Sequence, residues 1–289
     1  MIQKVKIIEL NVNSIKSKYK QHCLESFIEQ YQPDAMLLVE TKLTKTLKFN
    51  IKDYKIYRDD CEINSGGGTA IMIKQNFQAE HINIQTFSSF EQTTVKVYLN
   101  NNNAIFLTSI YKPPDKRLKT NELNLLIDKY NKKQFIIGGD LNCTHMYWGN
   151  AMNKPEGTKL YKWLVDSIDR HKIIAPITDS PTCVRKNSES FIDLFLVEEC
   201  ININYSSTTQ KLTTIDFDSD HRAVVLEITL QDKVVCSEPK RVYDWNKANY
   251  KKIRKYIDSK LDEVYLPVSR NLENDQIDAA VTKINEITQ

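Results

Sequence analysis

Glycine and proline are scarce, at 7 and 8 of 289 residues, so each place where they cluster marks a turn or the end of an element. Long apolar runs are also missing, since no stretch reaches the roughly 18 apolar residues that suggest a membrane-spanning helix. The N-terminal residues pass directly into a strand-like segment and contain no apolar core of a signal peptide. These absences predict an intracellular protein without a membrane span.

Cysteine is present, but not as a local binding motif. The chain has no Cys-x-x-Cys pair, and no cysteine stands beside a histidine at the spacing of zinc ligands. We expect reduced, mostly buried thiols at Cys23, Cys61, Cys143, Cys183, Cys200 and Cys236.

An excess of one charge is lacking too, because the net charge is only +3. The charges are unevenly spread: residues 231–260 hold nine Lys/Arg against four Asp/Glu, and residues 262–289 hold two against six. The basic stretch fits phosphate contacts or, equally, a solvated helix face.

Hydrophobic periodicity predicts many strands and a few helices. Strands are expected at residues 5–12, 35–39, 54–58, 69–73, 81–86, 93–99, 104–111, 135–137, 191–197 and 223–229, and helices at 23–31, 118–130 and 160–171. This pattern favours a layered domain over residues 1–230, with two packed sheets and the helices outside. Residues 231–244 are expected to form a linker, and residues 245–289 a helical segment.

Polar residues recur at the ends of the apolar runs. They are Asn11, Glu40, Asp140 with Asn142, Asp193, and Asp220 with His221. Any one of them alone fits a turn or a helix cap. A carboxylate beside an apolar strand is costly unless it is paired or binds a cation, so their joint occurrence predicts a metal and phosphate site at the strand ends.

These residues lie in motifs that resemble those of the endonuclease/exonuclease/phosphatase superfamily, which includes DNase I and the apurinic/apyrimidinic endonucleases. The motifs are Leu10-Asn11, Val39-Glu40-Thr41, Tyr111, Gly139-Asp140-Leu141-Asn142, Ile192-Asp193-Leu194 and Ser219-Asp220-His221. Tyr111-Lys112-Pro113-Pro114 and residues 142–149 are similar to the non-LTR retrotransposon branch. The resemblance covers about residues 5–230. It implies an α+β fold, a four-layer αββα sandwich with its site at one edge of the sheets, followed by a C-terminal helical extension that leads toward a reverse transcriptase.

A set of roles follows as a hypothesis. One Mg²⁺, with Mn²⁺ as a possible substitute, is held mainly by Glu40 with help from Asp220 or Asn11. Asp140 activates or orients the attacking water, and Asn142 fixes the phosphate or Asp140. His221, oriented by Asp193, binds a non-bridging phosphate oxygen, and Tyr111 adds a hydrogen bond to the transition state.

Four further residues are candidate DNA contacts: Lys112, His145, Trp148 and Thr182. Structural roles are the alternatives, with Trp148 in the core and His145 in a structural loop. The implied activity is hydrolysis of double-stranded DNA that leaves a 3′-hydroxyl for target-primed reverse transcription, with element RNA and a reverse transcriptase domain as possible partners. A nuclear location follows only from that substrate. The alternatives are a phosphoesterase of the same superfamily acting on inositol phosphates or sphingomyelin, and an inert DNA-binding remnant.

Overall fold

The computed structural model describes residues 3–60, 67–98, 104–167 and 172–230. The predicted linker at 231–244 and helical segment at 245–289 lie outside the described residues. Among the described helices, none has the length and apolar character that crossing a membrane requires.

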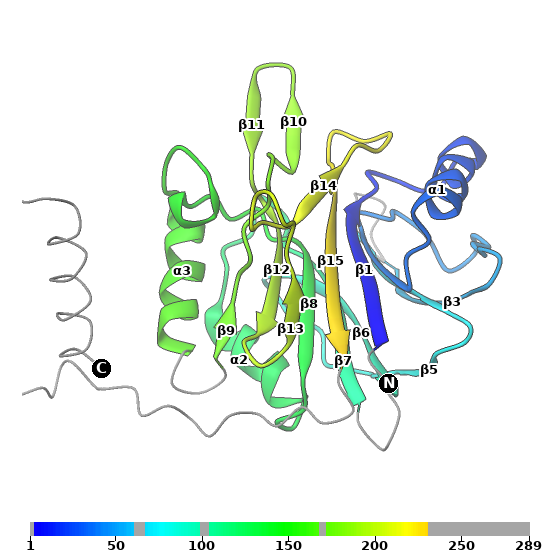
Figure 1. The fold of residues 1–289 in the computed structure, drawn as a ribbon, viewed down its shortest axis with the longest axis horizontal. Coiled ribbons are helices and arrows are strands. Elements are labelled where there is room, and N and C mark those ends of the chain that lie inside the picture. Colours follow the sequence, from blue (N-terminus) through cyan, green and yellow to red (C-terminus); the bar gives the residue numbers. More distant parts are fainter. Residues whose placement is uncertain (1–2, 61–66, 99–103, 168–171, 231–289) are drawn as a thin grey trace, which may run out of the picture. The chain divides into compact units, whose positions relative to one another are not determined.

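Two mixed sheets form the centre of the fold (Figure 1). The first has the order β13 (Asn202–Asn204), β15 (Ala223–Leu230), β1 (Gln3–Asn11), β2 (Ala35–Val39), β4 (Thr69–Lys74) and β3 (Tyr54–Asp59), and β14 (Thr213–Ile215) also pairs with β15. The second has the order β5 (Gln78–His81), β6 (Glu91–Tyr98), β7 (Ala104–Tyr111), β8 (Phe135–Asp140), β12 (Asp193–Glu198) and β9 (Ile173–Ile174). A separate hairpin consists of β10 (Cys183–Arg185) and β11 (Ser188–Ser190).

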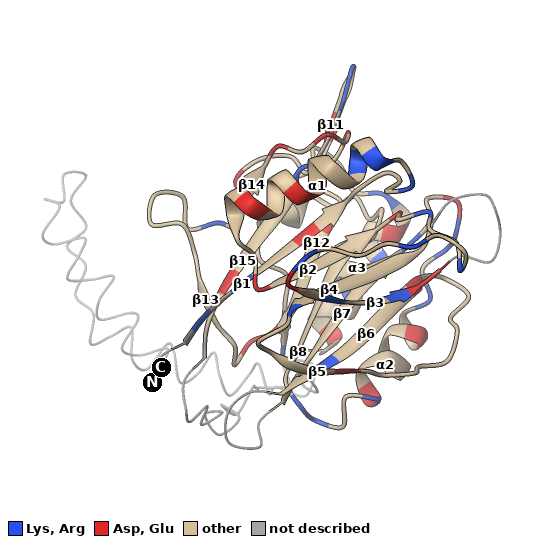
Figure 2. Ribbon diagram, turned by 90° about the vertical axis from the view of Figure 1, so that its right-hand side faces the viewer, with Lys and Arg blue, Asp and Glu red and all other residues tan. Residues whose placement is uncertain are grey.

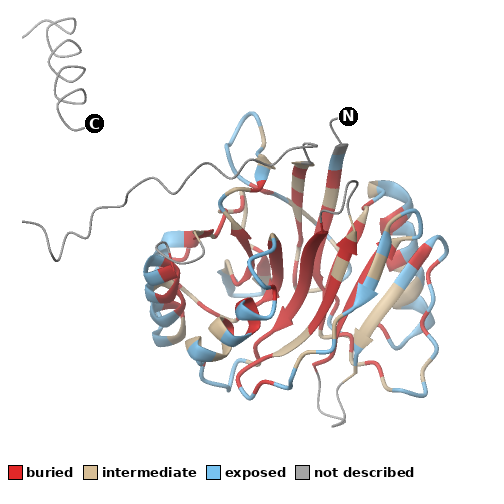
Figure 3. Cartoon of the chain, turned by 90° about the horizontal axis from the view of Figure 1, so that it is seen from below, coloured by how far each residue is buried: buried red, intermediate tan, exposed pale blue. Residues whose placement is uncertain are grey.

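Helices cover the outer face of each sheet. α1 (Lys18–Tyr31) packs Leu24 and Phe27 on the first sheet, whereas α2 (Thr120–Asp128) and α3 (Pro155–Ser167) pack on the second. A third apolar cluster fills the space between the sheets, where the strands are buried along most of their length (Figure 3). These three cores confirm the predicted four-layer αββα sandwich.

Side-chain alternation explains why β1 reads as a nearly continuous apolar run. Ile7 faces the cluster between the sheets, whereas Ile8 and Leu10 face the cluster under α1. Both faces of the strand are therefore buried, and apolar residues are needed at successive positions. β1 is parallel to β2, and β7 to β8, so the carboxyl ends of each pair lie together at one edge.

Several predicted elements have other bounds in the structure, and the helix expected at 23–31 begins at Lys18. The strand expected at 81–86 lies earlier in the chain, because β5 covers Gln78–His81. Ile82 and Ile84 belong to the loop that follows and pack against the apolar cluster under α2 and α3. The helix expected from residue 160 begins at Pro155, where the fixed φ of proline suits a first helical turn.

Candidate active site

The ends of six strands bring the predicted site residues to one edge, the upper edge in Figure 1. Asn11, Tyr111 and Asp140 are the last residues of β1, β7 and β8, and Glu40 directly follows β2. Asp193 begins β12 opposite Asp140 in the antiparallel register, and His221 lies two residues before β15. The layer between the sheets is apolar in its middle and polar at this edge, where the predicted site residues lie.

Asn11 joins two of the carboxylates. Its Nδ2 donates to Glu40 Oε1 at 3.0 Å and to Asp140 Oδ2 at 3.1 Å, and its Oδ1 accepts from the backbone N–H of Asn13 at 3.0 Å. An amide nitrogen has no lone pair for a cation. In this arrangement the Nδ2 of Asn11 positions Glu40 and Asp140, and a metal-ligand role for its Oδ1 stays a prediction.

Asp193 and His221 form a buried pair. His221 Nδ1 lies 2.9 and 2.8 Å from the two carboxylate oxygens of Asp193. Burial lowers the pKa of His221, but the charge and the hydrogen bond of Asp193 outweigh it and raise that pKa well above its usual range. The imidazole is therefore held in one orientation and favours its cationic form.

Asp140 occupies the centre of the acidic group. Its Oδ1 accepts from the backbone N–H of Asn142 at 2.9 Å. Burial, followed by the charge of Asp193, raises the pKa of Asp140 to about 8, against the smaller lowering by His221. A carboxyl whose pKa lies near neutrality can hold or release a proton under ordinary conditions.

Backbone strain marks two of the site residues. Glu40 and Asn142 both adopt left-handed backbone angles, with φ of 51° and 46°. Such conformations persist where surrounding structure imposes them, and they concentrate at functional sites. Asn142 also donates from Nδ2 to the carbonyl oxygen of Lys112 at 3.0 Å, which fixes its side chain beside Asp140.

Tyr111 contributes a neutral hydroxyl. Burial raises the pKa of Tyr111 far above its ordinary value, and the carboxylates of Glu40 and Asp140 raise it further. The phenol therefore stays protonated and can donate a hydrogen bond at the edge of the site.

Asp220 belongs to an ionic chain that sequence reasoning missed. Its carboxylate accepts from Arg185 Nε at 3.0 Å and from Asn13 Nδ2 at 3.3 Å. Asn13 Oδ1 in turn accepts from Lys42 Nζ at 2.7 Å, and Lys42 lies 3.3 Å from Glu40 Oε2. Lys42 could have been predicted, because it directly follows the Val39-Glu40-Thr41 motif. Arg185 lies in no motif.

These side-chain contacts connect Asp220 with Glu40, the two carboxylates that are candidate metal ligands. Glu40 and Asp220 offer hard oxygen donors, the type that Mg²⁺ prefers. Their negative charge is balanced by Lys42 and Arg185 in this arrangement. The donor chemistry therefore fits a divalent cation of the magnesium class.

Glu9 is a buried acid that the motif analysis did not single out. Glu9 lies two residues before Asn11 on β1, so both side chains point to the same face of the strand. It is fully buried, and neither carboxyl oxygen has a hydrogen-bond partner among the described residues. Burial, followed by the charges of Asp193 and Asp140, raises the pKa of Glu9 well above its usual range. Its place in an apolar strand, two residues before Asn11, was the signal available in the sequence.

The candidate DNA contacts are mostly buried. Lys112 is inaccessible, and its Nζ donates to the carbonyl oxygens of Pro113 and Lys116, so this structure leaves it no surface for DNA. Trp148 packs in the core beneath α2 and α3, and its Nε1 donates to the Cys143 carbonyl oxygen. Both side chains are packed inside the protein in this structure, and their contact with DNA stays a prediction.

His145 and Thr182 also have structural partners. The His145 ring stacks on Tyr161 at 4.4 Å between centroids, and its Nδ1 accepts from the backbone N–H of Tyr147. Thr182 is fully buried, and its hydroxyl accepts from the backbone N–H groups of Ile192 and Asp193 at 3.1 Å each. Thr182 therefore fixes the start of β12, where Asp193 stands.

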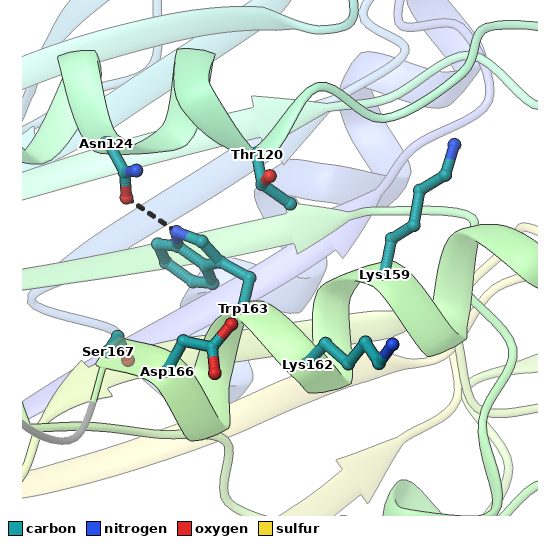
Figure 4. A pocket seen from close by; sticks show the side chains of 7 residues that line it. All are labelled: Thr120, Asn124, Lys159, Lys162, Trp163, Asp166 and Ser167. Carbon is teal, nitrogen blue, oxygen red and sulfur yellow. Dashed lines mark hydrogen bonds between the residues drawn. The ribbon is translucent and has the colours of Figure 1, made fainter.

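A pocket of about 330 Å³ lies elsewhere, between α2 and α3 (Figure 4). Trp163 Nε1 donates to Asn124 Oδ1 across it at 2.7 Å. Its lining consists of Thr120, Asn124, Lys159, Lys162, Trp163, Asp166 and Ser167. None of the predicted site residues is among them, so this hollow in the helical layer is separate from the candidate active site.

Several known proteins have sequences similar to this chain. The family model described as endonuclease-reverse transcriptase matches residues 105–225. A probable RNA-directed DNA polymerase from transposon BS of Drosophila melanogaster is 29% identical over 244 residues, which are 82% of this chain and 26% of that protein. The RNA-directed DNA polymerase from mobile element jockey of the same species is 25% identical over 70% of this chain and 21% of its own length. The chain thus spans about a quarter or less of these relatives.

Solved structures share the fold. The endonuclease domain of TRAS1, a telomere-specific non-LTR retrotransposon, matches with a TM-score of 0.62 and 18% identity, over 78% of this chain and 99% of that domain. The AP endonuclease LMAP from Leishmania major matches with a TM-score of 0.56 and 15% identity, over 79% and 89% of the two chains. The chain therefore shares the fold of these endonuclease structures, and its sequence is similar to part of the RNA-directed DNA polymerases of mobile elements and, over residues 105–225, to the endonuclease-reverse transcriptase family.

Proposed function

We propose that this chain is a magnesium-dependent endonuclease that nicks double-stranded DNA and leaves a 3′-hydroxyl. The observation that supports this most is the connected group of Asn11, Glu40 and Asp140 beside the Asp193–His221 pair at one edge of both sheets. The group combines anionic oxygens, a neutral phenol and a cationic imidazole. Hydrolysis of a phosphodiester needs the same set of functions, namely a proton acceptor for water and donors for the phosphate oxygens.

Each side chain has a role that its contacts support. Asp140 accepts a proton from the attacking water, or orients that water, while the Asn142 backbone holds its second oxygen. His221, kept in place by Asp193, donates to a non-bridging phosphate oxygen as negative charge develops. Tyr111 donates its phenolic hydrogen to the same transition state.

Glu40 and Asp220 are the residues proposed to hold Mg²⁺. Asn11 orients Glu40, and Lys42 and Arg185 are expected to give up their ion pairs when the cation binds. The bound ion would supply a Lewis acid that polarises the phosphoryl oxygen and stabilises the leaving 3′ oxygen.

The surface beside the site suits a polyanion. The β10–β11 hairpin carries exposed Arg185 and Lys186, and exposed Lys16 and Lys18 lie at the start of α1. In Figure 2 the ribbon is coloured for Lys and Arg at the hairpin and at one end of α1. Lysine and arginine placed around a phosphodiester site increase affinity for the DNA backbone irrespective of sequence.

The wider role is proposed from the relatives. Their names describe RNA-directed DNA polymerases of mobile elements. We propose that the 3′-hydroxyl left by the nick primes reverse transcription by such a polymerase on element RNA, which places the activity in the nucleus.

Two changes test this proposal on supercoiled plasmid. Asp140→Ala is expected to lower the nicking rate by at least about 10²-fold, since loss of one stabilising or proton-accepting group costs this much in other enzymes. Asp128→Ala, an exposed acid at the end of α2, is the matched control and should nick as the wild type does. Extension of the nicked strand by a DNA polymerase checks the 3′-hydroxyl. Nicking by Asp140→Ala at the wild-type rate would contradict the catalytic role proposed for Asp140.

A further inference from the structure

A cysteine lies next to the histidine of the active site, although the two are far apart in sequence. Cys183 and His221 form an isolated antiparallel bridge. The ligand atoms of Cys183, Asp220 and His221 all lie within 4.8 Å of one another. Cys183 and His221 are buried, and Asp220 is partly exposed. One thiol, one imidazole and one carboxylate therefore converge at a point that solvent reaches.

Backbone hydrogen bonds hold the three residues in this arrangement. The N–H of Val184 donates to the carbonyl oxygen of Asp220 at 2.8 Å, and the N–H of Arg222 donates to that of Thr182 at 2.7 Å. These two bonds flank Cys183 on one strand and His221 on the other. A rigid scaffold of this kind is what preorganises a ligand set.

The carboxylate that holds His221 resembles the partner of histidine ligands at metal sites. The His221 Nδ1 is bound to the Asp193 carboxylate, which fixes the ring and directs Nε2 away from that acid. Histidine ligands of zinc commonly hold their second nitrogen on a carboxylate in this way. A metal ion at this position would bind the imidazole nitrogen and the thiol in their deprotonated forms.

We propose that Cys183, Asp220 and His221 form a binding site for a thiolate-preferring divalent cation such as Zn²⁺, and that occupation of this site inhibits the nuclease. A thiolate and an imidazole select Zn²⁺ over Mg²⁺, whose preferred ligands are all oxygens. Three protein ligands leave the fourth tetrahedral position open to water. The inhibitory part rests on the proposed function. The bound cation would prevent His221 from donating to the phosphate and Asp220 from binding Mg²⁺.

Binding is tested first without any nuclease assay, by titrating the wild-type chain with Co²⁺ as a spectroscopic substitute for Zn²⁺. A near-ultraviolet thiolate-to-cobalt charge-transfer band is expected, and Zn²⁺ should abolish it. Cys183→Ala should lack the band, whereas Cys143→Ala, which removes another buried thiol, should keep it. No band in the folded wild type, or a band that survives in Cys183→Ala, would overturn the proposal.

Inhibition is tested separately with plasmid nicking at fixed Mg²⁺ and increasing Zn²⁺. Cys183→Ala is expected to need at least about tenfold more Zn²⁺ for half-inhibition than the wild type or Cys143→Ala, because even an outer partner of a metal ligand contributes that much to affinity. Equal sensitivity of the three proteins would refute the inhibitory role. If the wild type does not nick at all, the proposed function fails, and the cobalt titration still decides whether the site exists.

Discussion

Glu9 lies under the site with a carboxyl group that no described side chain or backbone group satisfies. An ionised carboxylate in such a place is costly, and the charges of Asp193 and Asp140 add to the cost. The folded chain therefore keeps the Glu9 proton to higher pH than the unfolded chain does. Such a group lowers stability as the pH rises above its unfolded pKa of about 4.3.

Glu9→Gln should remove this dependence, because glutamine has nearly the same shape and no charge. We expect the variant to have a higher Tm than the wild type at about pH 8, with the difference shrinking toward about pH 5. Thermal melting followed by circular dichroism across this range measures the effect. The exposed Glu29→Gln is the control, and a Tm difference for Glu9→Gln that does not change with pH would argue against a protonated Glu9.

The Asp193–His221 pair gives a second prediction at this scale. Asp193 raises the pKa of His221, so the wild type keeps its imidazolium through neutral pH. In Asp193→Asn the pKa should fall, and nicking should decline as the pH rises through roughly 6.5, the ordinary value for histidine. Single-turnover rates across that range would show it. Parallel pH profiles for the two proteins would contradict a cationic role for His221.

Among the elements, the long strands were predictable and the short ones were not. β1, β2 and β7 are buried on both faces, and their apolar runs are unbroken enough to mark them. β9, β10, β11, β13 and β14 have two or three residues each, too few to show a period. β5 is an edge strand, and it was placed too late in the sequence. Ile82 and Ile84 alternate as in a strand, but they lie in the following loop and pack against the cluster under α2 and α3.

The same contrast holds for the site. Asn11, Glu40 and Asp140 follow long strands, so their convergence could be predicted from strand ends. Arg185 and Cys183 reach the site through the β10–β11 hairpin, whose position depends on tertiary packing. Their pairing with Asp220 and His221 joins residues far apart in sequence, and no local pattern encodes it.

Thr182 connects these elements and can be tested by stability. Thr182→Val removes the oxygen that accepts from the N–H groups of Ile192 and Asp193, and each unsatisfied buried donor costs about 1–3 kcal/mol. We expect urea unfolding to show a loss in that range or above, and Thr182→Ser, which keeps the oxygen, to lose less. Equal stability of Thr182→Val and the wild type would show that water replaces the hydroxyl.

At the scale of the molecule, the three apolar clusters found among the described residues join both sheets and their helices into one packed domain. The contacts group Met1–Cys236 into one compact unit. A chain cut after Cys236 is therefore expected to fold with an unchanged Tm and to nick plasmid at the rate of the full chain. A lower Tm would show that later residues stabilise the sandwich, and a lower rate alone would assign them to DNA binding.

Glu40 is the residue on which the proposed activity depends most directly. The decisive measurement is nicking of supercoiled plasmid by the wild type, Glu40→Ala and the exposed control Glu29→Ala, each with Mg²⁺ and with EDTA. We expect open circles with Mg²⁺ from the wild type and Glu29→Ala, and none from Glu40→Ala or in EDTA. Nicking that persists in EDTA or in Glu40→Ala, or a folded wild type that does not cleave with Mg²⁺ or Mn²⁺, would contradict a metal-dependent endonuclease built on Glu40.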